Sequence, residues 1–117
     1  VENSCTTVTG ERRGIVGNAR VNDTAQLHVS FPGVPSQDSL DGPTNYIVTY
    51  LADDYSWAFV GDSTRLSGFV LSRSPVVDPA AWQEIRRVVE NSGYNACLML
   101  TSPTTEGMQE IRPLCTV

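Results

Sequence analysis

Three apolar runs separated by short polar turns occupy residues 46–75, and they constrain the fold more than any other feature. The runs are Tyr46–Leu51, Trp57–Gly61 and Leu66–Leu71, and each is about as long as a β-strand. All are rich in β-branched and aromatic residues, which favour strands. Because strands joined by short turns must be antiparallel neighbours, this stretch predicts a three-stranded meander.

Two motifs within the meander resemble those of the lipocalin family, nearest to its bacterial and apolipoprotein D-like branch. The turn Asp53–Tyr55 is similar to the second family motif, of the Thr-Asp-Tyr type, and Ser72–Pro75 matches the third, Ser-Arg-x-Pro. The resemblance runs from about Val1 to Ser102, but the first motif, Gly-x-Trp, is absent. It implies an all-β fold: an antiparallel up-and-down barrel with one C-terminal α-helix packed outside and a short final strand.

A helix is expected directly after the meander. Asp78 is a favourable N-cap, Pro79 suits the first helical position, and Gly93 is expected to end the helix. One helix face is apolar and should cover the outward side of the central strands. That face consists of Trp82, Ile85 and Val89, and the strand residues that it is expected to cover are Ile47, Leu51, Trp57, Phe59 and Val70.

Further strands are expected on both sides of this region, at Val1–Val8, Gly14–Val21, Ala25–Phe31 and Asn95–Thr101. We interpret residues 1–117 as a single lipocalin-like domain that corresponds to the third family strand onward. The chain is therefore expected to be the C-terminal part of a longer or cleaved protein. An N-terminal fragment would supply the first two strands, held non-covalently or through Cys97, or two copies would exchange strands.

The family register implies a cavity lined by apolar and aromatic side chains, which suits a small hydrophobic ligand. Strand alternation supports this for Leu27, Val29 and Phe31, whose neighbours are polar. The resemblance extends the lining to Tyr46, Val48, Tyr50, Ala58, Val60, Phe69 and Leu71, and it gives Arg73 and Trp82 structural roles.

The expected function is binding or transport of a lipid, retinoid, pigment or similar molecule, with no catalysis and no required cofactor. Two alternatives remain open: an enzyme on the same barrel, or an interaction or storage protein with a vestigial cavity. An enzyme would need a reactive group at the cavity, and Cys97 is the candidate thiol. His28, the single histidine, falls on the polar side of its strand and is expected at the surface, without metal ligands nearby.

The net charge and a glycosylation motif indicate which partners and which cellular location to expect. The net charge of −5 argues against nucleic acid and anionic membranes as partners. Asn22 begins the sequence Asn-Asp-Thr, a glycosylation acceptor, and the resemblance implies a secreted or otherwise extracytoplasmic glycoprotein. The resemblance also implies a disulfide between Cys5 and Cys115, because many lipocalins join this region to the C-terminal tail. Cys97 would then be left free or joined to another chain.

Overall fold

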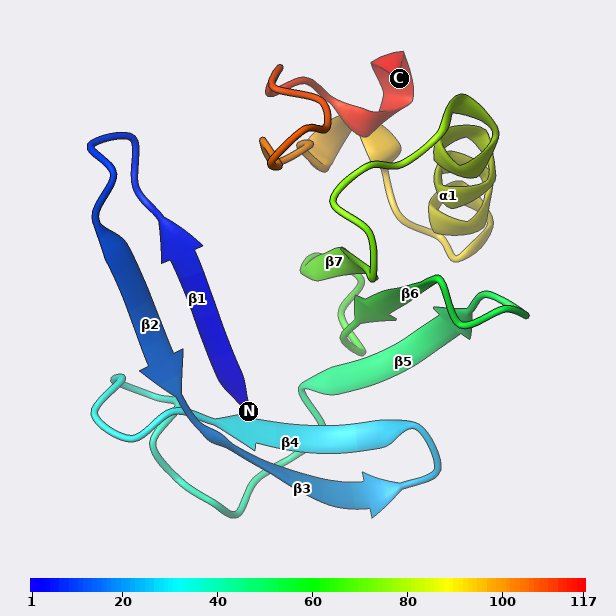
Figure 1. Ribbon diagram of the computed structural model, residues 1–117. Helices are drawn as coiled ribbons and strands as arrows, with labels where there is room; N and C mark the ends of the chain where they lie inside the picture. Colours follow the sequence, from blue (N-terminus) through cyan, green and yellow to red (C-terminus); the bar gives the residue numbers. More distant parts are fainter. The chain divides into compact units, whose positions relative to one another are not determined.

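The computed structural model describes residues 1–117, which form two compact units, Val1–Ile47 and Val48–Val117. Both contain antiparallel strands, and the second also carries the single α-helix (Figure 1). The all-β class, the antiparallel pairing and the helix after the meander are therefore confirmed. Each unit is described below by itself.

The first unit contains two antiparallel hairpins. Strand β1 (Glu2–Thr6) pairs with β2 (Arg12–Val16), and β3 (Asn18–Asp23) pairs with β4 (Gln26–Ser30). The single strand predicted over residues 14–21 is thus wrong, since Gly17 separates β2 from β3. A Cβ atom on Gly17 would collide with the Phe31 ring and the Ser30 carbonyl, so glycine permits this close approach.

The meander begins in the first unit and continues in the second. Strand β5 (Tyr46–Leu51) starts by pairing with β4, where Tyr46 lies opposite Leu27. Strands β6 (Trp57–Gly61) and β7 (Gly68–Ser72) form an antiparallel pair in which Phe59 lies opposite Val70. The expected meander is confirmed.

The helix α1 (Pro79–Asn91) begins and ends where its sequence signals predict. The Asp78 carboxylate accepts a hydrogen bond from the backbone N–H of Ala81 at 2.8 Å, which satisfies one of the free donors of the first turn. Gly93 follows the C-cap with φ +87°, a conformation that glycine adopts without steric cost. Neither α1 nor the two short 3₁₀ turns have the length and apolarity needed to cross a membrane.

The segment after α1 differs from the predicted final strand. Residues Ala96–Leu98 form a 3₁₀ turn, η1, because the Asn95 side chain accepts a hydrogen bond from the Cys97 N–H and caps it. Only Leu100 pairs as a bridge, with Pro113, before a second 3₁₀ turn, η2 (Leu114–Thr116). An asparagine cap therefore outweighed the apolar run that suggested a strand.

The predicted disulfide between Cys5 and Cys115 is wrong. Cys115 is bonded to Cys97, 18 residues earlier, and their Cα atoms are 4.9 Å apart. Cys5 is free and exposed on β1 in the first unit. Because η1 and η2 pack against each other, Cys97 and Cys115 already lie within bonding distance.

The main hydrophobic core lies in the second unit, between the sheet and α1. Phe59 and Val89 are fully buried there, and Tyr94 packs edge-on against Phe59 with ring centroids 4.9 Å apart. Val70 and Trp82 pack at the margin of this core. The expected covering of the central strands by α1 is thus confirmed for Trp57, Phe59 and Val70.

Candidate ligand-binding face

Strands β6 and β7 present two distinct faces. Trp57, Phe59 and Val70 belong to the core beneath α1. Because side chains alternate along a strand, their neighbours must point to the opposite face. The register places Ala58 opposite Leu71 and Val60 opposite Phe69, so these four apolar side chains form one patch. We call Ala58, Val60, Phe69 and Leu71 the open face.

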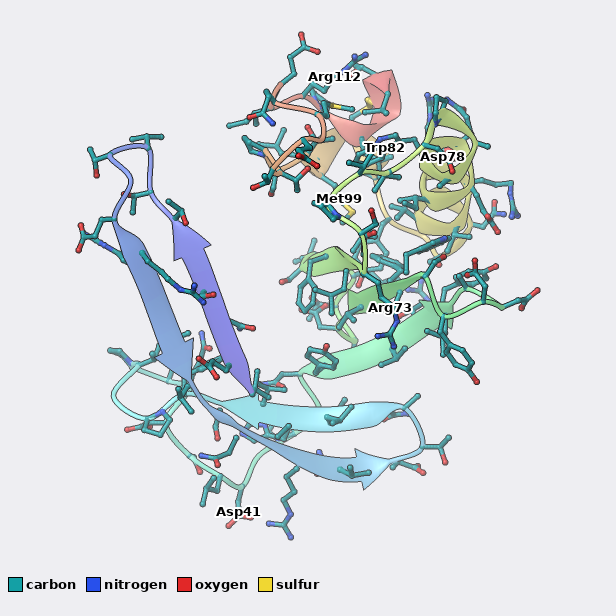
Figure 2. All side chains as sticks on the ribbon, in the orientation of Figure 1. Asp41, Arg73, Asp78, Trp82, Met99 and Arg112 are labelled. Carbon is teal, nitrogen blue, oxygen red and sulfur yellow. A yellow bond between two sulfur atoms is a disulfide. The ribbon has the colours of Figure 1, made fainter.

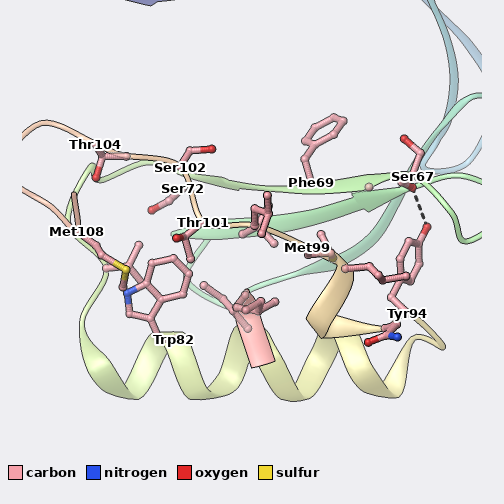
Figure 3. Close-up of a pocket in the computed structure, with 18 of the residues that line it drawn as sticks. Ser67, Phe69, Ser72, Trp82, Tyr94, Met99, Thr101, Ser102, Thr104 and Met108 are labelled. Atoms are coloured by element: carbon pink, nitrogen blue, oxygen red, sulfur yellow. Dashed lines mark hydrogen bonds between the residues drawn. The ribbon is translucent and has the colours of Figure 1, made fainter. Parts of the chain in front are cut away.

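The open face is apolar and partly accessible. Phe69 is 43% exposed and Leu71 is 50% exposed, whereas Val60 is buried. Figure 3 shows the Phe69 ring rising from β7 on the side away from α1. Exposed aromatic and branched side chains held on a paired, rigid sheet form a surface that can bury an apolar molecule.

The prediction that Tyr50 of β5 lines the cavity is wrong. Its ring stacks on Trp57 with centroids 5.0 Å apart, and its hydroxyl donates to the Glu84 carboxylate on α1 at 3.3 Å. Burial, followed by the nearby Glu84 charge, raises the pKa of this phenol. Tyr50 therefore belongs to the helix side of the sheet, and alternation gives Val48 the same side.

The turn after β5 determines which face of the strand carries Tyr50. The Ala52 N–H donates to the Trp57 carbonyl at 3.0 Å, and both side chains are buried in the core. Tyr50 lies two residues before Ala52 and shares its face, whereas Leu51 points the other way and is 44% exposed. A shift of one residue exchanges the faces of a strand, so Leu51 replaces Tyr50 on the open face.

The predicted lining residues of the first unit lie on β4 and at its end. Leu27 faces Tyr46 directly across the pairing of β4 with β5, so these two side chains share a side. Val29 is buried, and Phe31 is half-buried against the backbone at Gly17. The structure thus brings Leu27 and Tyr46 together, and alternation along β5 puts Tyr46 on the same side of the strand as Val48 and Tyr50.

Arg73 physically joins the two sequence motifs. Its Nε atom donates to the Tyr55 carbonyl at 2.7 Å, and its backbone N–H donates to the Ser56 carbonyl at 2.9 Å. Figure 2 shows Arg73 extending over the strands at this end. In the same turn the Asp54 pKa lies below its ordinary value because of its hydrogen bond with Ser56. These contacts give Arg73 and Asp54 a structural role.

His28 is buried, so the prediction that it lies at the surface is wrong. Its two ring nitrogens lie 2.8 Å from the carbonyl oxygens of Pro43 and Ser39. Both carbonyls belong to the proline-rich segment that follows β4 and folds back over it. Gly42 packs directly on the imidazole, where any larger residue would collide. His28 therefore anchors this segment to β4.

The reactive groups considered from sequence are not gathered at one place. Cys97 forms a disulfide, so the thiol that an enzyme on this fold was expected to use is not free. No group of three or more His, Cys, Asp or Glu side chains is arranged to hold a metal ion. Asn22, the predicted glycosylation site, is exposed at the end of β3 beside the hairpin turn.

A large groove runs along β7 toward α1, and sequence reasoning missed it; Phe69 of the open face also borders this groove. It has a volume of about 830 Å³ and lies between β7, the start of α1 and residues 93–114 (Figure 3). Tyr94 closes one end, because its hydroxyl donates to the Ser67 carbonyl and accepts from the Asp62 N–H, both at 3.1 Å. The available signal was Gly61 and Gly68, two strand glycines that leave room for the Tyr94 ring.

Comparison with protein families gives one match, a lipocalin-like domain, over residues 1–104. The match covers both units and includes the turn and the arginine motif described above. The chain belongs to the lipocalin-like family. Such domains generally bind hydrophobic ligands and seldom catalyse reactions. No curated protein is similar enough to this lipocalin-like chain to be reported as a relative.

Proposed function

We propose that this lipocalin-like chain binds and carries a small hydrophobic molecule, such as a lipid, a retinoid or a pigment. The observation that carries the proposal is the open face: four apolar side chains on the paired strands β6 and β7, with Phe69 substantially exposed. Burial of apolar surface contributes about 25 cal/mol per Å², so a retinoid-sized molecule gains most of its binding energy from such a face.

A fluorescence titration with retinol tests this proposal. Phe69→Ala should weaken binding about 10- to 100-fold, because loss of one buried aromatic contact costs about 1.5–3 kcal/mol. Val8→Ala is the matched control, since Val8 is fully exposed in a turn of the other unit and should leave affinity unchanged. Equal affinity for wild type, Phe69→Ala and Phe69→Asp would refute binding at the open face.

Extracellular function and glycosylation belong to the same proposal. The disulfide between Cys97 and Cys115 supports an oxidising compartment, where such bonds persist. Asn22 is exposed beside a turn, which suits attachment of a glycan. Intact mass before and after enzymatic removal of N-glycans from secreted material tests this: no mass loss would argue against modification of Asn22.

The proposal also includes a polypeptide partner. We expect further strands to come from an N-terminal fragment or from a strand-exchanged second copy. Support comes from the strand order, in which β7 has β6 on one side and no strand on the other. Denaturing chromatography of native material tests this, because a single species of this chain's mass that is monomeric in solution would contradict both arrangements.

A further inference from the structure

One polar face of the β3–β4 hairpin holds the proline-rich segment that follows β4. Arg20 lies directly opposite His28 across the two strands, so these two side chains share a face. Arg20 forms an ion pair with Asp41 of the segment. Asn22, two residues after Arg20, donates from its amide to the Thr44 hydroxyl at 3.2 Å. Among the side chains that the hairpin uses here, only histidine ordinarily changes its charge near neutral pH.

The His28 ring meets two hydrogen-bond acceptors at once. Its Nδ1 atom lies 2.8 Å from the Pro43 carbonyl oxygen, and its Nε2 atom lies 2.8 Å from the Ser39 carbonyl oxygen. A neutral imidazole has one N–H and one lone pair, so it can donate to only one of these carbonyls. The imidazolium ion has two N–H donors and satisfies both. Because His28 is buried, water does not readily replace a missing donor, and the contacts match the protonated ring.

The charges beside the ring are close to balanced and include more anions than cations. The charged and titratable groups on the packed elements are Arg20 and Asp23 on β3, Asp38 and Asp41 in the segment, and Tyr46 at the start of β5. The ion pair with Asp41 offsets the positive charge of Arg20. Tyr46 lies opposite Leu27 and therefore on the other face of β4 from His28. A positive charge on the ring therefore faces no unpaired cation among these groups.

We propose that His28 is a pH-sensitive latch, in which protonation of the ring tightens residues 39–43 onto β4 and loss of the proton loosens them. The end of the segment is held independently, since the Asn45 side chain makes two 2.8 Å hydrogen bonds with the Val29 backbone. The latch should loosen as pH rises through the range, about 6.5, in which histidine side chains ordinarily lose a proton. This switch lies within the first unit and goes beyond ligand binding at the open face.

Amide exchange in the wild-type chain tests the latch at about pH 5.5 and about pH 7.5, with each rate corrected for intrinsic exchange at that pH. The Asp41 N–H donates to the Ser39 hydroxyl at 3.3 Å. Its protection should fall about tenfold at the higher pH, because one of the two ring contacts is lost. The Asn45 N–H donates to the Leu27 carbonyl at 3.1 Å and should keep its protection within about twofold.

Two variants separate His28 from the other groups. His28→Gln carries an amide that does not titrate, so the protection of Asp41 should be the same at both pH values. This variant retains the Val1 amine, which donates to the Gly17 carbonyl at 3.0 Å and belongs to a class that titrates near pH 8. Asn22→Ala is the matched control, since it removes a contact that does not titrate. It should lower the protection about threefold at both pH values and preserve the tenfold change between them.

The ring itself gives a reading that does not depend on folding of a variant. The chain has one histidine, so nitrogen-15 NMR of the wild type reports on His28 alone. Both ring nitrogens should carry a proton at the lower pH while the segment stays docked. A neutral ring in the docked state at that pH would overturn the proposal.

Three exchange results would also overturn it. Protection of Asp41 that stays within about twofold between the two pH values would mean that the segment does not respond to the ring. The same pH dependence in His28→Gln would assign the effect to another group, such as the Val1 amine. Equal loss of protection at Asp41 and Asn45 would mean that the whole unit opens, with no local latch.

Discussion

The two units use antiparallel strands in opposite ways. In the second unit β6 is almost completely buried, with Trp57 and Phe59 in the core beneath α1, whereas every residue of β1, β2 and β3 in the first unit is exposed. The first unit exposes Val16 and Val21, at 68% and 71%, without a helix to cover them. A strand pair without a packed face is only marginally stable. Stability should therefore reside mainly in the second unit.

The largest effect is expected from Phe59→Ala. Phe59 is fully buried against Tyr94, and removal of a core aromatic ring costs about 3–5 kcal/mol of unfolding free energy. The matched change in the first unit, Val21→Ala, should cost less than about 0.5 kcal/mol because the side chain is exposed. Urea unfolding followed by tryptophan fluorescence measures the loss in the second unit, where Trp57 and Trp82 lie, and amide exchange in β3 and β4 measures the loss in the first. Equal losses of unfolding free energy in the two variants would contradict the claim that stability resides mainly in the second unit.

The next effect is expected at the cysteines. Replacing both Cys97 and Cys115 with alanine should lower the unfolding free energy by about 3 kcal/mol. The disulfide joins residues 18 positions apart, and closing a loop of about 15 residues contributes a similar amount. Cys5→Ala should change the unfolding free energy by less than about 0.5 kcal/mol. A non-reducing peptide map supplies the direct control. Recovery of a Cys5–Cys115 peptide would contradict the structure.

A smaller effect within the first unit is expected from His28→Ala. Removal of the imidazole deprives the carbonyls of Ser39 and Pro43 of their contacts, at about 1–3 kcal/mol for a buried polar group. The loss should appear as amide exchange at least tenfold faster in residues 32–45. Exchange in α1 should be unchanged. Faster exchange throughout both units would mean that His28 supports more than its own segment.

The smallest effect is expected from the turn between β6 and β7 in acid. Hydrogen bonding to Thr64 lowers the pKa of Asp62 below its ordinary value. A depressed pKa means that this carboxylate stabilises the fold above its unfolded-state pKa and loses that contribution as pH falls through the folded value. Unfolding midpoints of wild type and Asp62→Asn should therefore converge in acid below pH about 4. A difference that persists in acid would contradict this.

The predictions that succeeded rest on features that are local in the sequence. The limits of α1 followed from Asp78, Pro79 and Gly93 because capping is local chemistry. The burial of Trp57 and Phe59 followed from alternation combined with an apolar helix face. These features depend mainly on residues close together in the sequence.

The failures depended on contacts between distant residues. The face of Tyr50 is set by how Ala52 meets Trp57 across a turn, which alternation alone does not fix. His28 is buried because a segment more than ten residues away folds over it, and its polar strand neighbours gave no sign of this. Cys115 reached Cys97 because two short 3₁₀ turns formed where an extended strand was expected.

The central claim is that the face of β6 and β7 turned away from α1 binds the ligand. Isotope-filtered NOE spectroscopy of the retinol complex tests it most directly. We predict contacts from retinol protons to the methyl groups of Ala58, Val60 and Leu71 and to the ring of Phe69. Phe69 borders both surfaces, so contacts to Met99, Met108 and Trp82, with none to Ala58, Val60 or Leu71, would put the ligand in the groove and contradict the account.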